Sequence, residues 1–146
     1  EVRRVRDDIY LSDYVSGCAM MISSSIFPVV GLLDERFVSF WEETDFCYRS
    51  REKGYQTVCD RGIHVLHKGS ASFNKISEVK EYYMTRNRFL FFKRHSASFS
   101  YPSVGLYSIY YFTRRLGYLL STRNVKNTRS LIRGVMDGLL VPSEVD

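Results

Sequence analysis

The sequence is poor in cysteine and has no long uninterrupted hydrophobic run. Its three cysteines, Cys18, Cys47 and Cys59, are odd in number and lack the CxxC spacing of zinc sites. This argues against a disulfide framework and a cysteine zinc site, and it favours a reducing cytoplasm. Residues 96–113 carry no charge, but serines, tyrosines, Pro102 and Gly105 interrupt the run, so it does not predict a membrane span.

The chain also lacks an initiator methionine, a secretory signal, an internal repeat and a low-complexity tract. It begins abruptly with the charged stretch Glu1–Asp8. These features predict a fragment of a longer protein. Its 146 residues, of which 45% are hydrophobic, nevertheless suffice for one ordinary domain with a core.

Positive charge and aromatic side chains are both plentiful. The net charge is +5, and aromatic residues make up 15% of the chain, with eleven tyrosines and ten phenylalanines. Such a balance suits anionic partners: nucleotide diphosphates, phospholipid headgroups or nucleic acid. The basic residues are dispersed and no RNA-binding or zinc motif appears, which argues against nucleic acid.

The most informative stretch is the acidic segment at residues 40–49. Three carboxylates, Glu42, Glu43 and Asp45, fall within four residues, directly after Trp41. A fold tolerates such crowding at a helix N-terminus, around a cation, or where acid–base chemistry is done. A solvated first helical turn is the alternative. The flanking aromatic residues argue against full solvation.

Local patterns predict the secondary structure around this segment. The acidic residues open a helix over 42–53, which Gly54 ends, and Asp45 and Arg49 are spaced to pair on one face of it. Gly17 lies inside an apolar run of strand length and suggests a close backbone approach or a bulge. The other expected elements are an edge strand or linker at 1–12, strands at 14–22, 56–60 and 63–67, a short helix at 26–30 capped by the serines at 23–25 and ended by Gly31, and helices at 79–94 and 128–140.

The uncharged, aromatic segment at 96–113 is followed at once by Arg114, Arg115 and Arg123. This pattern is typical of a segment that lies flat on a membrane surface. A helix packed on its own domain or on a partner chain would have the same composition.

Taken in order, six motifs resemble the second half of a family 2 glycosyltransferase, especially the bacterial rhamnosyltransferase-like members. The resemblance covers about residues 12–140. The motifs are Val15–Met21, Val30–Phe37, Trp41–Arg49, Lys53–Tyr55, His67–Ser72 and Tyr82–Arg88, and Arg133–Leu139 is similar to the family's closing helix.

The resemblance implies an α/β fold: the C-terminal half of a Rossmann-like GT-A domain, followed by a helical extension. Residues 1–95 would be the acceptor-side and catalytic-base half, and residues 96–146 the aromatic, basic extension. The implied reaction is inverting transfer of a sugar from a nucleotide-diphospho sugar to an acceptor hydroxyl, in the synthesis of bacterial surface polysaccharide. The acceptor would be a glycan or a lipid-linked sugar.

The resemblance also implies roles for individual residues. The family's base is the second acid of a Glu-Asp pair, which corresponds here to Glu43, with Glu42 tuning it by like-charge coupling. Because Glu43 stands where the family has Asp, it stays open whether Glu42 or Glu43 is the base. Gly17 and Cys18 would line the acceptor groove by backbone. The other expected substrate contacts are Trp41, Asp45, Arg49, Lys68, Ser70, Ser72, Arg86 and Asn87. A helix-surface salt bridge is the alternative for Arg86.

The family's Asp-x-Asp motif, which binds Mg or Mn, is not in this sequence. His67 corresponds to a family histidine that reaches the metal or the diphosphate, and a structural histidine is the alternative. The remaining ligands, and the nucleotide pocket, are expected in an N-terminal half. We therefore expect the fragment to bind no metal and to be inactive alone, and to self-associate through exposed apolar surface.

Two other classes of function remain open. One is a non-catalytic basic module that binds a membrane surface or nucleic acid. The other is a dimerisation segment with residues 96–140 as its interface. For the enzyme, the resemblance implies a cytoplasmic location with contact to the inner face of the membrane, and no nucleic-acid partner.

Overall fold

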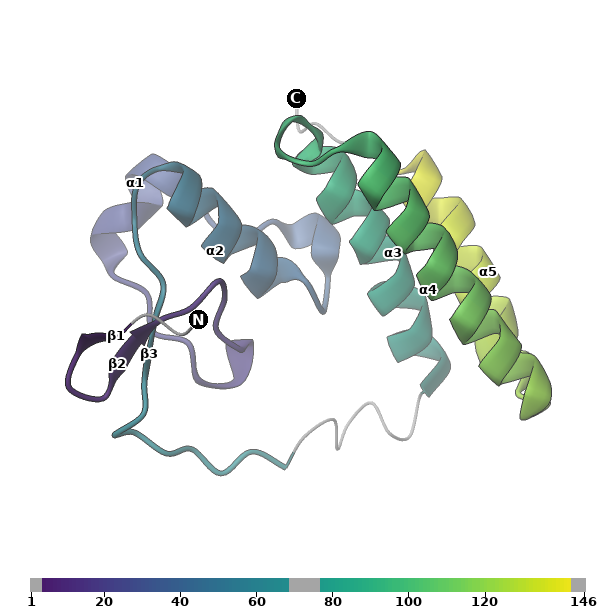
Figure 1. The fold of residues 1–146 in the computed structure, drawn as a ribbon, viewed down its shortest axis with the longest axis horizontal. Helices are drawn as coiled ribbons and strands as arrows, with labels where there is room; N and C mark the ends of the chain where they lie inside the picture. The colour runs from purple at the N-terminus through teal and green to yellow at the C-terminus, as the bar shows by residue number, and fades with distance from the viewer. Residues whose placement is uncertain (1–3, 69–76, 143–146) are drawn as a thin grey trace. The chain divides into compact units, whose positions relative to one another are not determined.

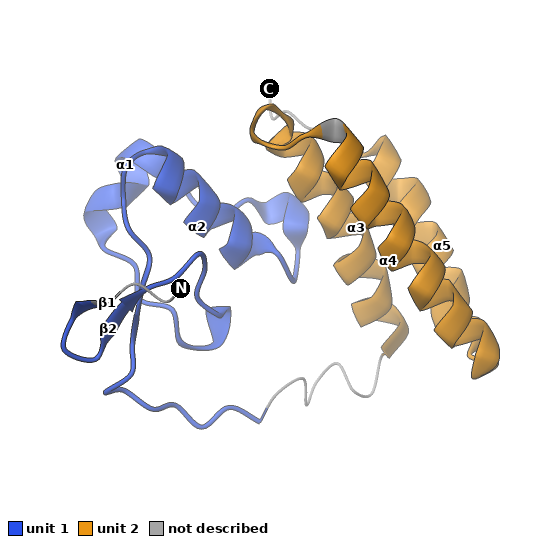
Figure 2. Ribbon diagram, in the orientation of Figure 1, with its two compact units in different colours: residues 1–69 blue, residues 70–146 orange. Residues whose placement is uncertain are grey.

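The computed structural model describes residues 4–68 and 77–142. The chain divides into two compact units, residues 1–69 and 70–146 (Figure 2). The division at residue 69 rests on packing, whereas the expected division at residue 95 rests on function. The functional division stays a prediction.

Unit 1 contains a small antiparallel sheet of three-residue strands (Figure 1). The strands are β1 (Arg4–Arg6), β2 (Ile9–Leu11) and β3 (Val58–Asp60), in the order β1-β2-β3. Tyr10 of β2 pairs with Cys59 of β3. The edge strand expected within residues 1–12 is therefore confirmed, and the strand expected at 56–60 is confirmed in its last three residues.

The strands expected at residues 14–22 and 63–67 are wrong. Gly17–Ala19 form a single 3₁₀ turn, η1, and residues 63–68 have no regular structure. A strand needs a neighbouring edge to pair with, and the described strands pair only with one another. The apolar run is also not covered, since Met21 is 97% exposed. A short apolar run does not by itself distinguish a strand from an irregular segment.

The helices of unit 1 follow the local signals. A 3₁₀ turn at Ser24–Ile26 leads into α1 (Phe27–Val30), which ends at Gly31 with φ of 83°. The helix α2 (Glu42–Glu52) ends before Gly54, which has φ of 85°. Both glycines have a positive φ, which would strain a residue with a Cβ atom. The expected helices at 26–30 and 42–53 are confirmed. The expected serine cap is wrong, because Ile26 stands at the N-cap of α1 and Ser23, at the N-cap of the preceding 3₁₀ turn, makes no side-chain capping hydrogen bond.

The core of unit 1 lies between α1, α2 and the loop that joins them. Phe37 and Phe46 are almost fully buried, and Val30 and Cys47 are buried beside them. The rings of Phe27 and Phe46 lie 5.9 Å apart, a distance typical of tilted aromatic pairs. This core fixes the buried face of α2.

Unit 2 consists of three helices: α3 (Ser77–Arg94), α4 (Tyr101–Ser121) and α5 (Val125–Leu140). The expected helices at 79–94 and 128–140 are confirmed, and most of the uncharged aromatic segment forms the start of α4. None of the helices in the described part of the chain is both long and apolar enough to cross a membrane.

Helices α3 and α5 approach closely at two glycines. A Cβ atom added to Gly134 would lie 2.8 Å from the Tyr82 carbonyl oxygen, and one added to Gly138 would lie 2.9 Å from that of Arg86. Real Cβ atoms do not tolerate such contacts. The glycines therefore set the distance between the two helices.

Polar side chains join α3 to both of its neighbours. Glu81 is buried and accepts hydrogen bonds from Arg115 of α4, whose Nε lies 3.0 Å from Oε1. The guanidinium of Arg88 lies 3.2 Å from the centre of the Tyr111 ring. Tyr82 donates a 2.8 Å hydrogen bond to Asp137 of α5. These contacts are partly buried and connect α3 to both of its neighbours.

Substituting Gly138→Ala should therefore destabilise unit 2. Its added methyl group meets backbone rather than a flexible side chain, so we expect a loss of about 1–3 kcal/mol in the free energy of unfolding. The measurement is urea unfolding followed by helical circular dichroism.

The matched control is Gly117→Ala in α4, where, apart from the neighbouring residues and backbone of α4 itself, no described atom lies within 4 Å of the new Cβ. It should stabilise the protein by about 0.5–1 kcal/mol through helix propensity. Equal effects of the two substitutions would contradict the close packing of α3 on α5.

Candidate active site

The candidate site is the first turn of α2. The helix begins after Trp41, whose carbonyl oxygen accepts a 2.8 Å hydrogen bond from the Asp45 backbone N–H. Glu42, Glu43 and Asp45 all lie in this first turn, as expected. Negative charge is favoured there by the partial positive charge of the helix N-terminus.

Asp45 and Arg49 form a buried ion pair that joins α2 to a distant loop. Asp45 is fully buried, and Arg49 Nε lies 2.7 Å from its Oδ2. The same guanidinium donates from Nη1 to the Val30 carbonyl oxygen and from Nη2 to that of Leu32, at 2.8 Å for the latter. Arg49 thus satisfies carbonyl groups at the end of α1. The predicted pairing is confirmed, while contact of either residue with a substrate stays a prediction.

The carboxyl groups of Glu42 and Glu43 are partly withdrawn from water. Among the described residues, the Oε2 atom of each is buried and has no hydrogen-bond partner. Burial, and then the charge of Glu43, raise the pKa of Glu42 above its ordinary value. Unsatisfied buried oxygens cost stability. The two oxygens can accept hydrogen bonds from water or from a ligand.

Gly17 lies directly beside the Glu43 carboxyl group. A Cβ atom placed on Gly17 would be 4.0 Å from Cδ of Glu43. Both Gly17 and Cys18 are exposed in the turn η1. Two groups of predicted site residues, far apart in the sequence, therefore meet: the expected base and the expected acceptor-groove turn.

The backbone before the acidic turn is strained, which the sequence does not indicate. Val38, Phe40 and Trp41 have φ values of 61°, 69° and 76°. Residues with a Cβ atom rarely adopt such positive φ values. Each such residue costs on the order of 1–3 kcal/mol, and such strain is concentrated at functional sites. No glycine or asparagine stands at these positions to signal the turn.

The remaining predicted residues are distributed over both units. Trp41 is half-buried at the start of α2, whereas His67 and Lys68 are exposed in an irregular segment. Ser70 and Ser72 lie outside the described residues. In unit 2, Arg86 donates a 2.9 Å hydrogen bond from Nη1 to Oδ1 of the fully buried Asn87. Substrate contacts by these residues stay predictions.

The described residues do not fit a metal ion. Within residues 4–68 and 77–142, no three His, Cys, Asp or Glu side chains gather in a way that could hold one. His67 lies in the exposed segment, and the carboxyl groups of Glu42 and Glu43 are not joined by a third ligand. The expectation of Mg or Mn in a full-length enzyme stays a prediction.

Comparison with known proteins gives one informative similarity. The chain is 33% identical over 79 residues to the low-salt glycan biosynthesis hexosyltransferase Agl10 of Haloferax volcanii. The match covers 53% of this chain and 26% of that protein, so the chain corresponds to about a quarter of its relative. No family model and no solved structure matches the chain. The similarity supports a glycosyltransferase role in general terms.

Because Arg49 bonds both Asp45 and two backbone carbonyl groups, removing its charge should strongly reduce the stability of the protein. Arg49→Met removes the guanidinium that pairs with the fully buried Asp45 carboxylate and donates to two backbone carbonyl groups. We expect a loss of about 3–5 kcal/mol in the free energy of unfolding, measured with urea. Adding Asp45→Asn should recover part of that loss, because the buried charge is then removed.

Arg51→Met is the control on the same helix. Its partner Asp13 is 91% exposed, and Arg51 itself is 50% exposed at the side chain. Exposed pairs contribute less than about 1 kcal/mol. If Arg49→Met lowers the free energy of unfolding no more than Arg51→Met does, the bonds of Arg49 do not hold α2 in place.

Proposed function

We propose that this chain carries the acceptor-side, catalytic-base part of an inverting glycosyltransferase of family 2 with a GT-A fold. The observation that carries the proposal is the position of the Glu43 carboxyl group beside the exposed turn at Gly17. The similarity to a hexosyltransferase of glycan biosynthesis supports it.

The proposed reaction is a single displacement. The acceptor hydroxyl oxygen attacks the anomeric carbon of a nucleotide-diphospho sugar, and the bond from that carbon to the diphosphate oxygen breaks. The hydroxyl proton passes to the carboxylate of Glu43, and the nucleoside diphosphate leaves with the electron pair of the broken bond. Proton removal by a positioned carboxylate is general base catalysis.

The surroundings of the two acids differ. The Glu43 carboxyl carbon is the atom that would lie 4.0 Å from a Cβ on Gly17. Burial, and then the charge of Glu43, raise the pKa of Glu42 above its ordinary value. Neighbouring acids in different environments commonly divide their roles, and we assign proton acceptance to Glu43, the acid beside the exposed turn.

An exposed glycine turn suits the acceptor side of such a site. Gly17 presents backbone without a side chain, so an acceptor hydroxyl can approach the Glu43 carboxyl group. We propose a glycan or lipid-linked acceptor at this turn. In the intact enzyme, we propose a divalent cation, Mg or Mn, that neutralises the donor diphosphate.

The test is Glu43→Gln in the intact protein. Glutamine keeps the size of the side chain but cannot take a proton, so we expect transfer to fall by about 10²–10⁴-fold. Nucleoside diphosphate release would be measured with a panel of UDP-, dTDP- and GDP-sugars, with membrane extracts as the source of acceptors. Donor binding, measured by calorimetry, should be nearly unchanged.

Glu52→Gln is the matched control, since Glu52 is an exposed residue at the other end of α2. It should retain full transfer. Turnover by a folded Glu43→Gln protein at the rate of the control would rule out Glu43 as the base.

A further inference from the structure

Positive charge is concentrated in one of the two units. Residues 70–146 contain twelve basic and five acidic residues, a net charge of +7. Residues 1–69 contain nine basic and eleven acidic residues, a net charge of −2. The excess charge of the whole chain therefore belongs to the helical unit 2, and the proposed catalytic unit does not contribute to it.

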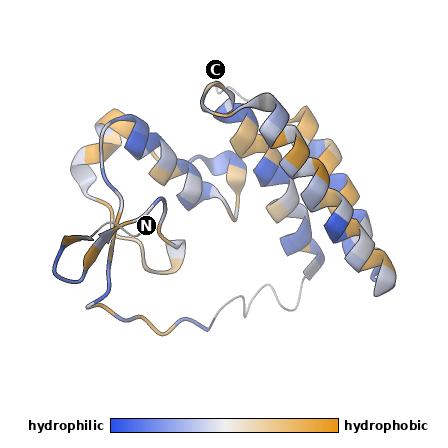
Figure 3. Cartoon of the chain, viewed as in Figure 1, coloured by the Kyte–Doolittle hydropathy of each residue, from blue (hydrophilic) through white to orange (hydrophobic). Residues whose placement is uncertain are grey.

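Helices α4 and α5 expose large apolar side chains at helical spacing. We define the outer face of unit 2 as Leu106, Ile109 and Leu120 of α4 together with Ile132, Met136 and Leu139 of α5. Each is at least 44% exposed. Leu131, Gly134 and Gly138 lie on the other side of α5 and are buried, the two glycines against α3. Hydrophobic positions along both helices are visible in Figure 3.

Basic residues lie beside this apolar face. Lys126 and Arg129 are exposed in the first turns of α5, and Arg129 is one helical turn from Ile132. Arg114 is exposed on α4 and donates a 2.9 Å hydrogen bond from Nη1 to the hydroxyl oxygen of Tyr110. An apolar face with arginine, lysine and tyrosine at its margin is typical of helices that lie in a membrane interface.

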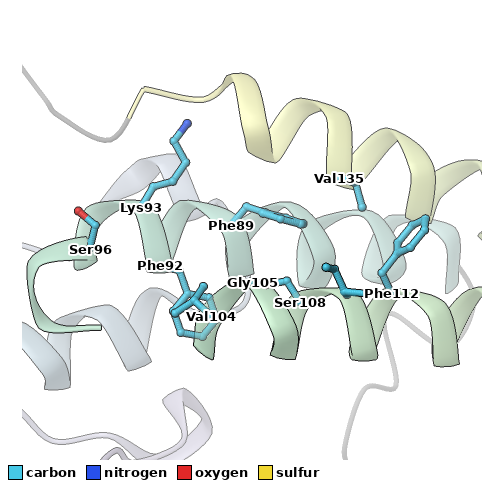
Figure 4. Close-up of a pocket in the computed structure, with 10 residues that line it drawn as sticks. Phe89, Phe92, Lys93, Ser96, Val104, Gly105, Ser108, Phe112 and Val135 are labelled. Carbon is cyan, nitrogen blue, oxygen red and sulfur yellow. The ribbon is translucent and has the colours of Figure 1, made fainter. Parts of the chain in front are cut away.

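Unit 2 also has a groove lined mainly by apolar side chains. It has a volume of about 630 Å³ and is lined by residues of all three helices (Figure 4). Phe89 and Phe92 of α3 and Phe112 of α4 supply its largest side chains. Lys93, at one end, donates from Nζ to the Leu139 carbonyl oxygen at 2.9 Å.

We propose that the outer face of unit 2 docks on the surface of an anionic lipid bilayer, with α4 and α5 parallel to that surface. Charge complementarity decides between this occupant and a second copy of the chain. Two copies would each bring a net charge of +7 to the contact and would repel, whereas anionic headgroups attract it. Docking of this face does not require the proposed transfer reaction.

The test is co-sedimentation of the purified protein with vesicles. Vesicles of phosphatidylcholine alone are compared with vesicles containing 30 mol% phosphatidylserine, each at low and high salt. The protein should bind the anionic vesicles at low salt and lose at least tenfold in affinity at high salt, since the attraction is screened. Binding that is equal on neutral vesicles, or absent from anionic ones, would overturn the proposal.

Substitutions locate the surface. Lys126→Gln with Arg129→Gln should weaken binding about 25-fold, at roughly fivefold per charge. The control pair, Lys53→Gln with Arg61→Gln, removes the same charge from unit 1 and should change binding less than twofold. An equal loss in both pairs would show attraction by net charge alone and would reject the outer face.

Apolar substitutions separate a bilayer from a second copy. Ile132→Ser with Met136→Ser should weaken vesicle binding roughly tenfold or more, whereas Leu66→Ser, at an exposed site in unit 1, should not. Both positions in α5 are exposed, so helical circular dichroism should be unchanged. Sedimentation velocity should show the same oligomeric state for every variant. A dimer that the α5 double substitution dissociates, together with no vesicle binding, would identify the outer face as a contact between copies.

Discussion

The buried ion pair between Asp45 and Arg49 is the interaction on which unit 1 depends. A carboxylate with no exposure to water requires a charged partner, and that partner also holds carbonyl groups at the end of α1. One guanidinium thereby fixes how α2 lies against the loop before it. The acidic first turn can then keep Glu42 and Glu43 partly buried, with Glu43 beside Gly17, because the helix that carries them is held in place.

Local signals in the sequence predicted most of the helices, and non-local pairing accounts for the errors. The acidic cluster predicted where α2 begins and Gly54 predicted where it ends. The four-residue spacing predicted the Asp45–Arg49 pair. The bonds from Arg49 to carbonyl groups 17 and 19 residues away carry no local signal. The expected strand at 14–22 failed for a related reason: strands need a partner edge, which an apolar run cannot supply by itself. For the site, the approach of Gly17 to Glu43 and the strained backbone at Trp41 follow only from the tertiary structure.

The two units divide the physical tasks. Unit 1 has a slight negative charge, a small core and two carboxyl groups without full hydrogen bonding. Unit 2 has a glycine-mediated helix contact, buried polar pairs and an outer face that is both apolar and basic. In unit 2, α3 and α5 pack closely at Gly134 and Gly138, while apolar side chains on α4 and α5 stay exposed. Catalysis and membrane contact, as proposed, would therefore respond to different substitutions.

The carboxyl groups of Glu42 and Glu43 interact electrostatically in the first turn of α2. A ¹³C NMR titration of the glutamate side-chain carboxyls, with Glu42 assigned by its substitution, measures this interaction. The pKa of Glu42 should lie above the ordinary glutamate value. Glu43→Gln should lower that pKa, without reaching the ordinary value because burial remains. An ordinary pKa for Glu42 in the unaltered protein, or no change on Glu43→Gln, would show that the two carboxyl groups do not interact in this way.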